Sequence, residues 1–347
     1  MFIHQHTCIS AQQTFADINI DALKASTDNK LKAAEPAYEG IPAGILRRMG
    51  KAVRMGVGAG LPIIKNNPQL DGIIIGTANG GMEDCIKFLN QIIDYEEGML
   101  TPGNFVQSTP NAIAAQLGLM GANKLYNVTH VHRGLAFESA LVDAMMMINE
   151  NPSSQYLVGG VDEISAYNFN IDYLEGWYKK EAIANTDLYS SHTAGSLAGE
   201  GAAMFLVNNN PYNAVAEIKA VQTIHTTDEE MVTQSLSDFL KQHVAPGETI
   251  EMFLTGENGD ARLTPYYTAA ESLFSNETTI ARYKHMSGEF PTSSAVAAWL
   301  ICHLQIIPLQ MIKRGTNDKQ INQCLIYNNY KGLQHSFLLI QKAINVY

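Results

Sequence analysis

The segment NVTHVHRGLAFESALVDAMMMI, residues 127–148, predicts a short strand that turns sharply into a helix. β-Branched residues precede the turn at Arg133-Gly134, and the residues after it are apolar nearly all the way round a helix, which predicts a buried one. Enzymes use such an elbow to activate a nucleophile, because the helix dipole and free N–H groups stabilise a thiolate or an oxyanion. Here, however, the turn reads Thr129-His130-Val131-His132 and contains no Cys or Ser.

The composition of the 347-residue chain is that of an ordered globular protein, with 46% hydrophobic and 16% charged residues. A formal net charge of −11 argues against a nucleic-acid-binding surface, which needs a basic stripe. The four cysteines form no CxxC pair, which favours free thiols in a reducing cytoplasm over a disulfide scaffold or a zinc knuckle. No signal peptide is visible, and the apolar stretch 293–312 is interrupted by His303 and Pro308. We therefore expect a cytoplasmic protein without a membrane span, and a core helix at 293–312.

Strands and helices are predicted to alternate along the whole chain. The first part has predicted strands at 1–10, 70–81, 155–163 and 198–209, helices at about 82–94 and after Pro110, and an irregular region at 165–197. The second part has predicted strands at 215–221, 251–256, 278–283, 323–329 and 336–342, with helices near 228–243, 265–274 and after Pro291. This alternation predicts an α/β protein with mostly parallel, helix-covered sheets in two halves, 1–210 and 211–347.

The main basic cluster, LRRMGKAVR at 46–54, is predicted to be one amphipathic helix with an apolar face and a basic face. Its cations are Arg47, Arg48, Lys51 and Arg54. A solvated helix face is the simpler interpretation, and a docking patch for a small acidic partner is the functional one.

Four motifs, taken in order, resemble those of the β-ketoacyl synthase family of thiolase-like condensing enzymes. LVGGVDE at 157–163 is similar to the family's AGGAE turn, and GEGAAMFLV at 199–207 to its GEGA strand. YKHMSGEFPTSSAVAAW at 283–299 is similar to its KxxxGH segment, and YNNYKGLQHSFLLI at 327–340 stands where it has a Gly-rich loop and last strand. The resemblance implies a dimeric, thiolase-like five-layer α-β-α-β-α fold of two pseudo-symmetric halves, and a substrate held on an acyl carrier protein. We expect no cofactor.

The resemblance also implies three catalytic side chains, a Cys at the elbow and two His, and none of them stands at a matching position. Val131 matches the nucleophile and has no lone pair with which to attack a thioester. In FLTGENGD, Glu257 or Asn258 falls near the first His position. Glu289 replaces the second His, next to Lys284, which matches the family's Lys. A carboxylate would repel a developing enolate, so all three catalytic positions are predicted to be lost.

These departures resemble the chain length factors, which pair with an active ketosynthase, including those of aryl polyene and flexirubin-type pathways. Residues 105–121 match the segment by which family members line the dimer interface, so that Phe105, Gln107 and Met120 would close the partner's acyl tunnel. The basic cluster would then dock an acyl carrier protein. Core packing is the simpler interpretation of each tunnel residue, and also of Met145–Met147. A homodimer remains an alternative to the heterodimer.

A second hypothesis keeps an enzyme at the elbow. His130 and His132, with Glu257, Lys284 and Glu289 nearby by analogy, could serve as a malonyl-acyl carrier protein decarboxylase or an atypical acyltransferase. A His pair can polarise a carbonyl, and decarboxylation needs no covalent acyl intermediate. A structural His pair packed at a helix end is the simpler explanation.

Metal binding is the third hypothesis. The pairs His4/His6 and His130/His132 each place two imidazoles on one side of a predicted strand, as metal ligands require. The sequence brings no third ligand into view, so we expect no metal.

Overall fold

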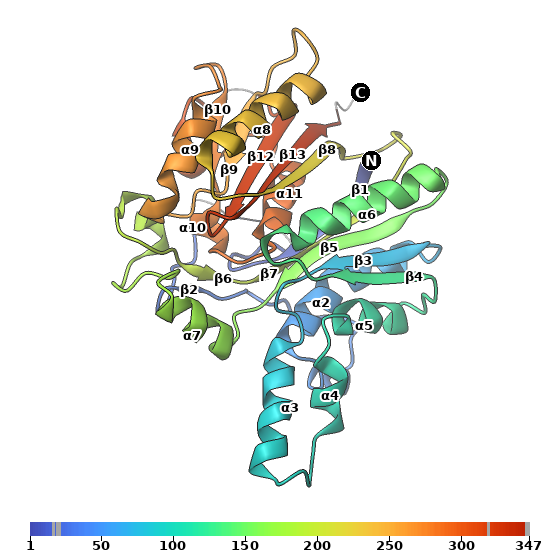
Figure 1. The fold of residues 1–347 in the computed structure, drawn as a ribbon. Coiled ribbons are helices and arrows are strands. Elements are labelled where there is room, and N and C mark those ends of the chain that lie inside the picture. Colours follow the sequence, from blue (N-terminus) through green and yellow to red (C-terminus); the bar gives the residue numbers. More distant parts are fainter. Residues whose placement is uncertain (16–17, 19–21, 318–319, 344–347) are drawn as a thin grey trace.

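The computed structural model describes residues 1–15, 18, 22–317 and 320–343. Eleven of the strands in these residues form one mixed sheet (Figure 1), whereas β2 (Lys30–Leu31) and β6 (Ala198–Gly199) pair with each other in a separate two-stranded sheet. Two sets of strands repeat the same order, β1-β7-β5-β3-β4 and β8-β13-β12-β9-β10, with β11 on the outer edge of the second set. The first set comprises β1 (Phe2–Ile9), β3 (Gly72–Gly76), β4 (Tyr126–His130), β5 (Tyr156–Asp162) and β7 (Gly201–Asn208). The second set comprises β8 (Ala216–His225), β9 (Met252–Thr255), β10 (Thr279–Arg282), β12 (Gln323–Tyr330) and β13 (Gln334–Lys342), and β11 is Ile312–Arg314.

The two sets meet where β1 pairs with β8, and the expected boundary at residue 210 falls in the loop between β7 and β8. Each set contains two parallel and two antiparallel pairings, so the prediction of mostly parallel sheets is wrong. The reason is clearest at β12 and β13, which a tight turn joins as a hairpin without an intervening helix.

Helices form the layers on either side of these strands (Figure 1). Helices α6 (Ala136–Glu150) and α11 (Ser293–His303) form the central layer, where Phe137 and Trp299 belong to one hydrophobic core with residues of both sets. Helices α2 (Lys51–Asn66) and α5 (Ala112–Met120) pack on the first set, and α8 (Glu229–His243) and α9 (Thr264–Glu271) on the second. The resulting layers are the expected α-β-α-β-α arrangement.

Two helices project from this body as an arm, at the bottom of Figure 1. They are α3 (Met82–Asp94), at the predicted position, and α4 (Pro102–Gln107), in a segment predicted to be a loop. Pro102 occupies the first turn of α4, where its missing N–H costs nothing. The rings of Phe88 and Phe105 hold the two helices together at 5.3 Å between centroids.

Two predicted helices differ from the structure, and a third helix forms in a region predicted to be irregular. The helix expected at 46–54 is broken, because α1 (Ala43–Leu46) ends and α2 begins only at Lys51, after Gly50. The helix at 293–312 stops at His303, and the region 165–197 contains the exposed helix α7 (Ala166–Leu174), capped by Ser165. Short elements complete the chain: β2 (Lys30–Leu31), β6 (Ala198–Gly199), α10 (Lys284–Ser287), η1 (Arg133–Leu135), η2 (Asn185–Ser190), η3 (Ala261–Leu263) and η4 (Leu309–Met311).

The prediction that α6 is buried all round is also wrong. One face is in the core, whereas Val142 is 39% exposed and Met146 is 59% exposed. Met146 is therefore not core filler in the single chain. No helix within the described ranges combines the length and apolarity that a bilayer-spanning segment requires.

The burial of His335 is expected to make the free energy of unfolding depend on pH. His335 lies in the second half with its ring nitrogens 3.0 Å from the Tyr327 hydroxyl and 3.0 Å from the Thr226 carbonyl oxygen, and burial lowers its pKa to about 4. Because this pKa is below the unfolded value, the neutral His335 ring contributes to the free energy of unfolding above about pH 6.5. This contribution is lost as pH falls toward 4. His335→Gln should flatten the fall in the free energy of unfolding across that window by up to about 1 kcal/mol per pH unit, measured by urea titration. The exposed His192→Gln is the control, and an equal effect of both substitutions would contradict the assignment.

Candidate active site

The elbow forms where it is predicted, between β4 and α6. β4 ends at His130, and the left-handed backbone of the turn falls at Arg133, with φ of 48°. Gly134 is required there, because a Cβ would lie 2.2 Å from Cβ of Tyr330. The Gly134 N–H donates to Oε1 of Gln334 at 3.0 Å, so the turn is fixed to the β12–β13 hairpin of the other half.

No thiol lies at this turn in the described part of the chain. The Val131 side chain is 53% exposed. Cys8, Cys302 and Cys324 are buried, and Cys85 lies on α3 in the projecting arm. The position that we expect from the resemblance to correspond to the nucleophile is therefore a surface valine in the single chain.

The two loops that we expect from the resemblance to correspond to those of the histidines meet in the structure. Nδ2 of Asn258 donates to Oε2 of Glu289 at 2.8 Å, and Oε1 of Glu289 accepts from Nζ of Lys284 at 2.9 Å. All three side chains are buried. Glu257 points elsewhere, because its carboxylate pairs with Arg282 at 3.3 Å and Lys313 at 2.6 Å. Of the two candidates in this loop, the structure thus brings Asn258, and not Glu257, to Glu289.

The charges at this contact are balanced inside the protein. Burial lowers the pKa of Lys284, whereas the adjacent Glu289 carboxylate raises it. Burial raises the pKa of Glu138 on α6, whose carboxylate accepts from Ser336 at 2.7 Å and interacts with Lys284. Burial, and then carboxylates that include Glu289, raise the pKa of Tyr330, the residue against Gly134. Glu289 therefore acts electrostatically on the hairpin that packs on the elbow.

A buried carboxylate that sequence reasoning did not single out ties these parts together. Asp162, at the end of β5, accepts from the N–H groups of Ala78 and Asn79 at 2.9 and 2.8 Å and from Thr77 Oγ1 at 3.1 Å. It also accepts from the N–H and hydroxyl of Thr292, just before α11, at 3.2 and 2.8 Å. Burial raises the pKa of Asp162 to about 6 despite these donors. The sequence signal that could have identified Asp162 is a carboxylate at the end of a continuous apolar run.

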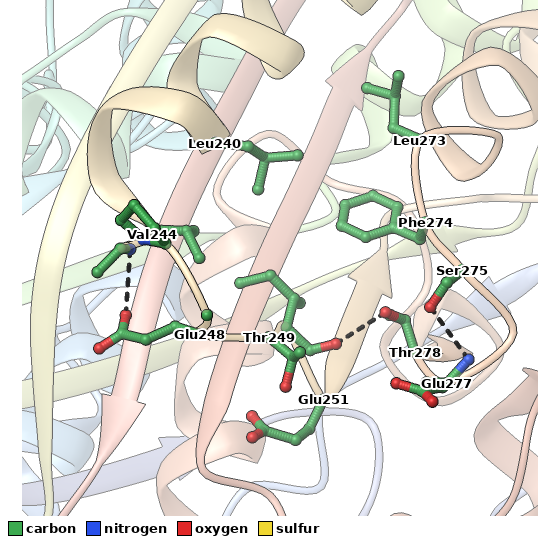
Figure 2. Close-up of a pocket in the computed structure, with 14 residues that line it drawn as sticks. Leu240, Val244, Glu248, Thr249, Glu251, Leu273, Phe274, Ser275, Glu277 and Thr278 are labelled. Carbon is green, nitrogen blue, oxygen red and sulfur yellow. Dashed lines mark hydrogen bonds between the residues drawn. The ribbon is translucent and has the colours of Figure 1, made fainter.

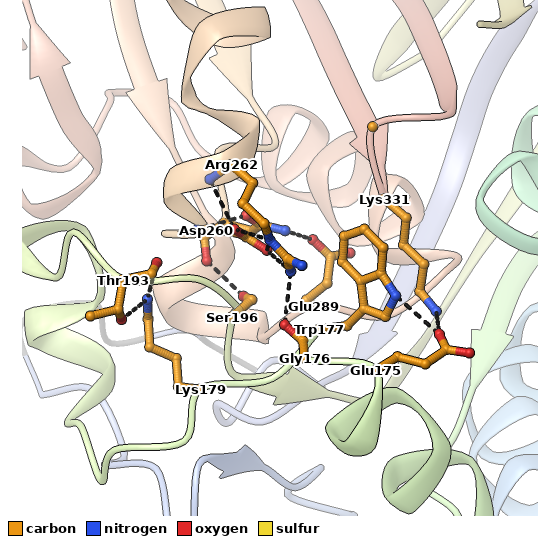
Figure 3. A network of polar contacts seen from close by, with 12 residues as sticks. Glu175, Gly176, Trp177, Lys179, Thr193, Ser196, Asp260, Arg262, Glu289 and Lys331 are labelled. Atoms are coloured by element: carbon orange, nitrogen blue, oxygen red, sulfur yellow. Dashed lines mark hydrogen bonds and ion pairs between the residues drawn. The ribbon is translucent and has the colours of Figure 1, made fainter. Parts of the chain in front are cut away.

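A polar network from the segment 175–196 holds the Asn258 loop (Figure 3). The buried Lys179 donates to the carbonyl oxygens of Thr193 and Gly259, at 3.0 and 2.9 Å, and Ser196 donates to the Asn258 carbonyl oxygen at 2.6 Å. The Arg262 guanidinium lies 4.3 Å from the Trp177 ring centroid and donates to the Gly176 carbonyl oxygen. The loop that carries Asn258 is therefore fixed by a region that the sequence predicts to be irregular.

The two elbow histidines have partners on α6. Nε2 of His130 lies 2.7 Å from Oδ2 of Asp143, and Nδ1 of His132 lies 3.4 Å from Oγ of Ser139. Within the described residues, no hydrogen bond or ion pair links either imidazole to Glu257, Lys284 or Glu289. The neighbourhood on which the decarboxylase hypothesis rested by analogy is thus not formed by direct contact.

The two His-x-His pairs also diverge. β4 ends at His130, so His132 lies beyond the strand. His4 is 2.8 Å from the Asn208 side-chain oxygen, while the His6 ring packs against Trp299 and His303. Among the described residues, no three His, Cys, Asp or Glu side chains are grouped to hold a metal ion.

The four cations of the basic cluster do not share one helix. Lys51 pairs with the buried Glu200, and Arg54 forms two hydrogen bonds with Glu35, at 2.5 and 2.7 Å. Arg47 and Arg48 are exposed in the turn between α1 and α2. The prediction of a single basic face is therefore wrong, because Gly50 interrupts the helix and two of the cations bind carboxylates of the same chain.

The three predicted tunnel residues lie in different surroundings. Phe105 is 60% exposed on the arm. Gln107 accepts from the Gly50 N–H at 2.5 Å and donates to the Arg48 carbonyl oxygen, so it bridges the junction of α1 and α2. Met120 is partly buried and packs against the core beneath α2.

A cavity of about 450 Å³ in the second half does not belong to this site (Figure 2). It is lined at the amino-terminal ends of β9 and β10, for example by Glu251 and Thr278, whereas Asn258 follows the carboxyl end of β9. The Glu251 carboxylate is already occupied, since it accepts from the Gln323 N–H at 2.6 Å.

Comparison with known proteins agrees with this geometry. Residues 22–238, well over half of the chain, match the family described as beta-ketoacyl synthase, N-terminal domain. A search of curated proteins finds no significant match.

Solved structures similar to this chain include ketosynthases and ketosynthase/chain length factor pairs. A beta-ketoacyl synthase from Burkholderia phymatum STM815 has a TM-score of 0.78 and 15% identity, with 99% of each chain covered. The ishigamide ketosynthase/chain length factor has a TM-score of 0.75 and 15% identity, again with 99% of each chain covered. The ketosynthase ApeO in complex with its chain length factor ApeC, from Xenorhabdus doucetiae, has a TM-score of 0.77 and 13% identity, covering 99% of this chain and 98% of that one. The fold is thus the thiolase-like ketosynthase fold, and the chain belongs to the β-ketoacyl synthase family.

Proposed function

We propose that this chain is a non-catalytic, chain length factor-type subunit that pairs with an active β-ketoacyl-acyl carrier protein synthase and shapes its acyl tunnel. The observation that carries the proposal is the buried hydrogen bond between Asn258 and Glu289, in the fold of a ketosynthase whose elbow carries Val131. Condensation needs a nucleophile to hold the acyl group and donors that stabilise an enolate oxygen. An alkyl side chain, an amide and a carboxylate supply neither the nucleophile nor a pair of imidazoles.

The electrostatics of the buried contact support the same conclusion. A developing enolate would face the negative Glu289, and the adjacent cation Lys284 is already paired with that carboxylate at 2.9 Å. Releasing Lys284 to a substrate would leave a buried carboxylate unpaired, which typically costs several kcal/mol, about 3–5 for breaking a buried pair. The contact is therefore better suited to hold two loops together than to stabilise an anion.

The surface around the elbow supports a partner subunit. β4 is the outermost strand of the first set, so its outer backbone groups are open to pairing. Exposed apolar side chains surround this edge: Leu119 on α5, Leu125 and Val131 beyond the two ends of β4, and Val142 and Met146 on α6. Such a collection beside an open edge favours an interface. We assign an active ketosynthase to it, because the elbow lacks a thiol, and two of the similar solved structures are such pairs by their titles.

The first prediction concerns the elbow. The isolated chain, incubated with radiolabelled acyl-acyl carrier protein, should form no covalent adduct at residues 129–134, because the turn has no thiol and Val131, at the expected nucleophile position, has no lone pair with which to attack a thioester. Val131→Cys should accept label at most and should not condense, since Asn258 and Glu289 are unchanged. Mass spectrometry of the labelled peptide is the measurement. An adduct on the unsubstituted elbow, or carbon dioxide release from malonyl-acyl carrier protein that His132→Ala abolishes, would overturn the non-catalytic assignment.

The second prediction concerns the interface. Co-expressed with an active β-ketoacyl-acyl carrier protein synthase that is its partner, the chain should co-purify with it at equal stoichiometry. Met146→Glu should reduce recovery of the pair at least tenfold, because it buries a charge at an apolar contact. Met231→Glu is the matched control, since Met231 is 52% exposed on α8 of the other half. Pair formation that resists Met146→Glu, or a stable dimer of this chain alone, would contradict the assignment of the partner.

The third prediction concerns product length. If the arm reaches the partner's tunnel, Phe105→Ala should open its floor and lengthen the acyl products of the pair by one or more two-carbon units. Ile93→Ala, 75% exposed on α3 of the same arm, is the control and should leave the products unchanged. Mass spectrometry of carrier-bound products distinguishes the two, and an unchanged distribution with Phe105→Ala would exclude this residue from the tunnel.

A further inference from the structure

A second cavity, of about 500 Å³, lies on the outer side of the first half between α2 and the segment 36–41. It is separate from the elbow, because its walls come from the face of the first sheet on which α2 packs. The α2 wall consists of Gly58, Leu61, Pro62 and Lys65, which share one helical face. Phe15 and Ile41 complete an apolar lining. Its volume is within the range of small-molecule sites, roughly 300–1,000 Å³.

The wall opposite α2 is held in place without a ligand. The Tyr38 ring lies against the α2 backbone, because Gly58 has no side chain and a Cβ there would be 2.0 Å from Cε1 of Tyr38. The Tyr38 hydroxyl donates to Glu35 at 2.5 Å, and Glu35 is in turn held by Arg54. These bonds maintain Tyr38 in a left-handed backbone conformation, with φ of 52°. A preformed wall lowers the ordering cost that binding would otherwise carry.

The charge at the mouth selects the ligand. Lys65 is exposed at the end of α2, and its Nζ lies over Gly40, 3.6 Å from where a Cβ would stand. Within the described ranges, no carboxylate lies within 4.0 Å of this ammonium group, and Glu35 is occupied by Arg54. Glu39, also on the lining, is exposed to solvent. Among the described residues, the cavity thus combines an apolar lining with the ammonium group of Lys65 without a carboxylate partner, which matches a molecule with an apolar tail and a single negative charge.

We propose that this cavity binds a small amphipathic carboxylic acid, with its alkyl or aryl tail against Leu61, Pro62 and Ile41 and its carboxylate at Lys65. One lysine suits a monoanion, whereas a phosphate dianion would need additional donors that the lining does not provide. The proposal is independent of whether the chain pairs with a ketosynthase.

Isothermal titration with decanoate and decanol tests the proposal on the full chain. Decanoate should bind at one site, and Lys65→Met should weaken it about fivefold, the size of an ion pair at a partly exposed mouth. Glu39→Gln should strengthen decanoate binding about twofold by removing a like charge. Decanol should respond to neither substitution. Lys87→Met, on the arm, is the matched control.

A cavity-filling variant keeps the test independent of charge. Ala37→Trp, at an exposed lining position, should abolish binding of both decanoate and decanol while leaving the thermal unfolding midpoint within a few degrees of the unsubstituted chain. The proposal is overturned if decanoate shows no saturable binding at millimolar concentration, if binding survives Ala37→Trp, or if Lys65→Met and Lys87→Met have equal effects. Equal weakening of decanol by Lys65→Met would likewise exclude the carboxylate contact.

Discussion

The carboxylate of Asp162 is the constraint on which the geometry of the site depends. It stands at the carboxyl end of β5 and accepts bonds from the loop after β3 and from Thr292 at the start of α11, so one buried group joins elements of both halves. Its neighbours extend the same role: Glu163 accepts from the Ala52 N–H, and the buried Glu200 accepts from the Ile164 N–H. Buried carboxylates persist only where donors satisfy them, so these bonds hold the loops in register. The elbow and the Asn258–Glu289 contact are both built on that frame.

The contact between Asn258, Glu289 and Lys284 is held together by charge balance within the chain. Two imidazoles facing an elbow thiol would form a site poised for an anionic intermediate. Here an amide and a carboxylate bond to each other, and Lys284 neutralises the carboxylate. Each buried polar atom in this set gains a partner from within the chain. Within the family architecture, this polar cluster therefore links the loop that carries Asn258 to the segment that carries Lys284 and Glu289.

Much of the fold follows from local sequence patterns. The apolar runs that end in Gly or Asn are strands β3, β5 and β7, and the Arg133-Gly134 turn is the elbow, because a buried strand must be continuously apolar and a sharp turn needs a permissive backbone. The wrong predictions have a common cause, which is dependence on contacts with residues that are distant in the sequence. Gly50 breaks the basic helix where Gln107, far away in sequence, bonds to both sides of the break. Met146 was expected to lie in the core. Helix periodicity identifies an apolar position, but it does not show which part of the chain or which partner covers that position.

The sequence by itself determined most of the alternation of strands and helices, the position of the elbow and the absence of Cys and Ser from its turn, since these depend on residue types and short-range spacing. Only the tertiary structure decided that Asn258 rather than Glu257 meets Glu289, that Lys51 and Arg54 are neutralised by Glu200 and Glu35, and that the apolar face of α6 opens beside β4. Each of these depends on which of two adjacent side chains, or which distant carboxylate, the backbone brings within hydrogen-bonding distance. Local pattern does not encode that choice, because contacts between distant segments are fixed by the packing of the two halves around their shared central helices.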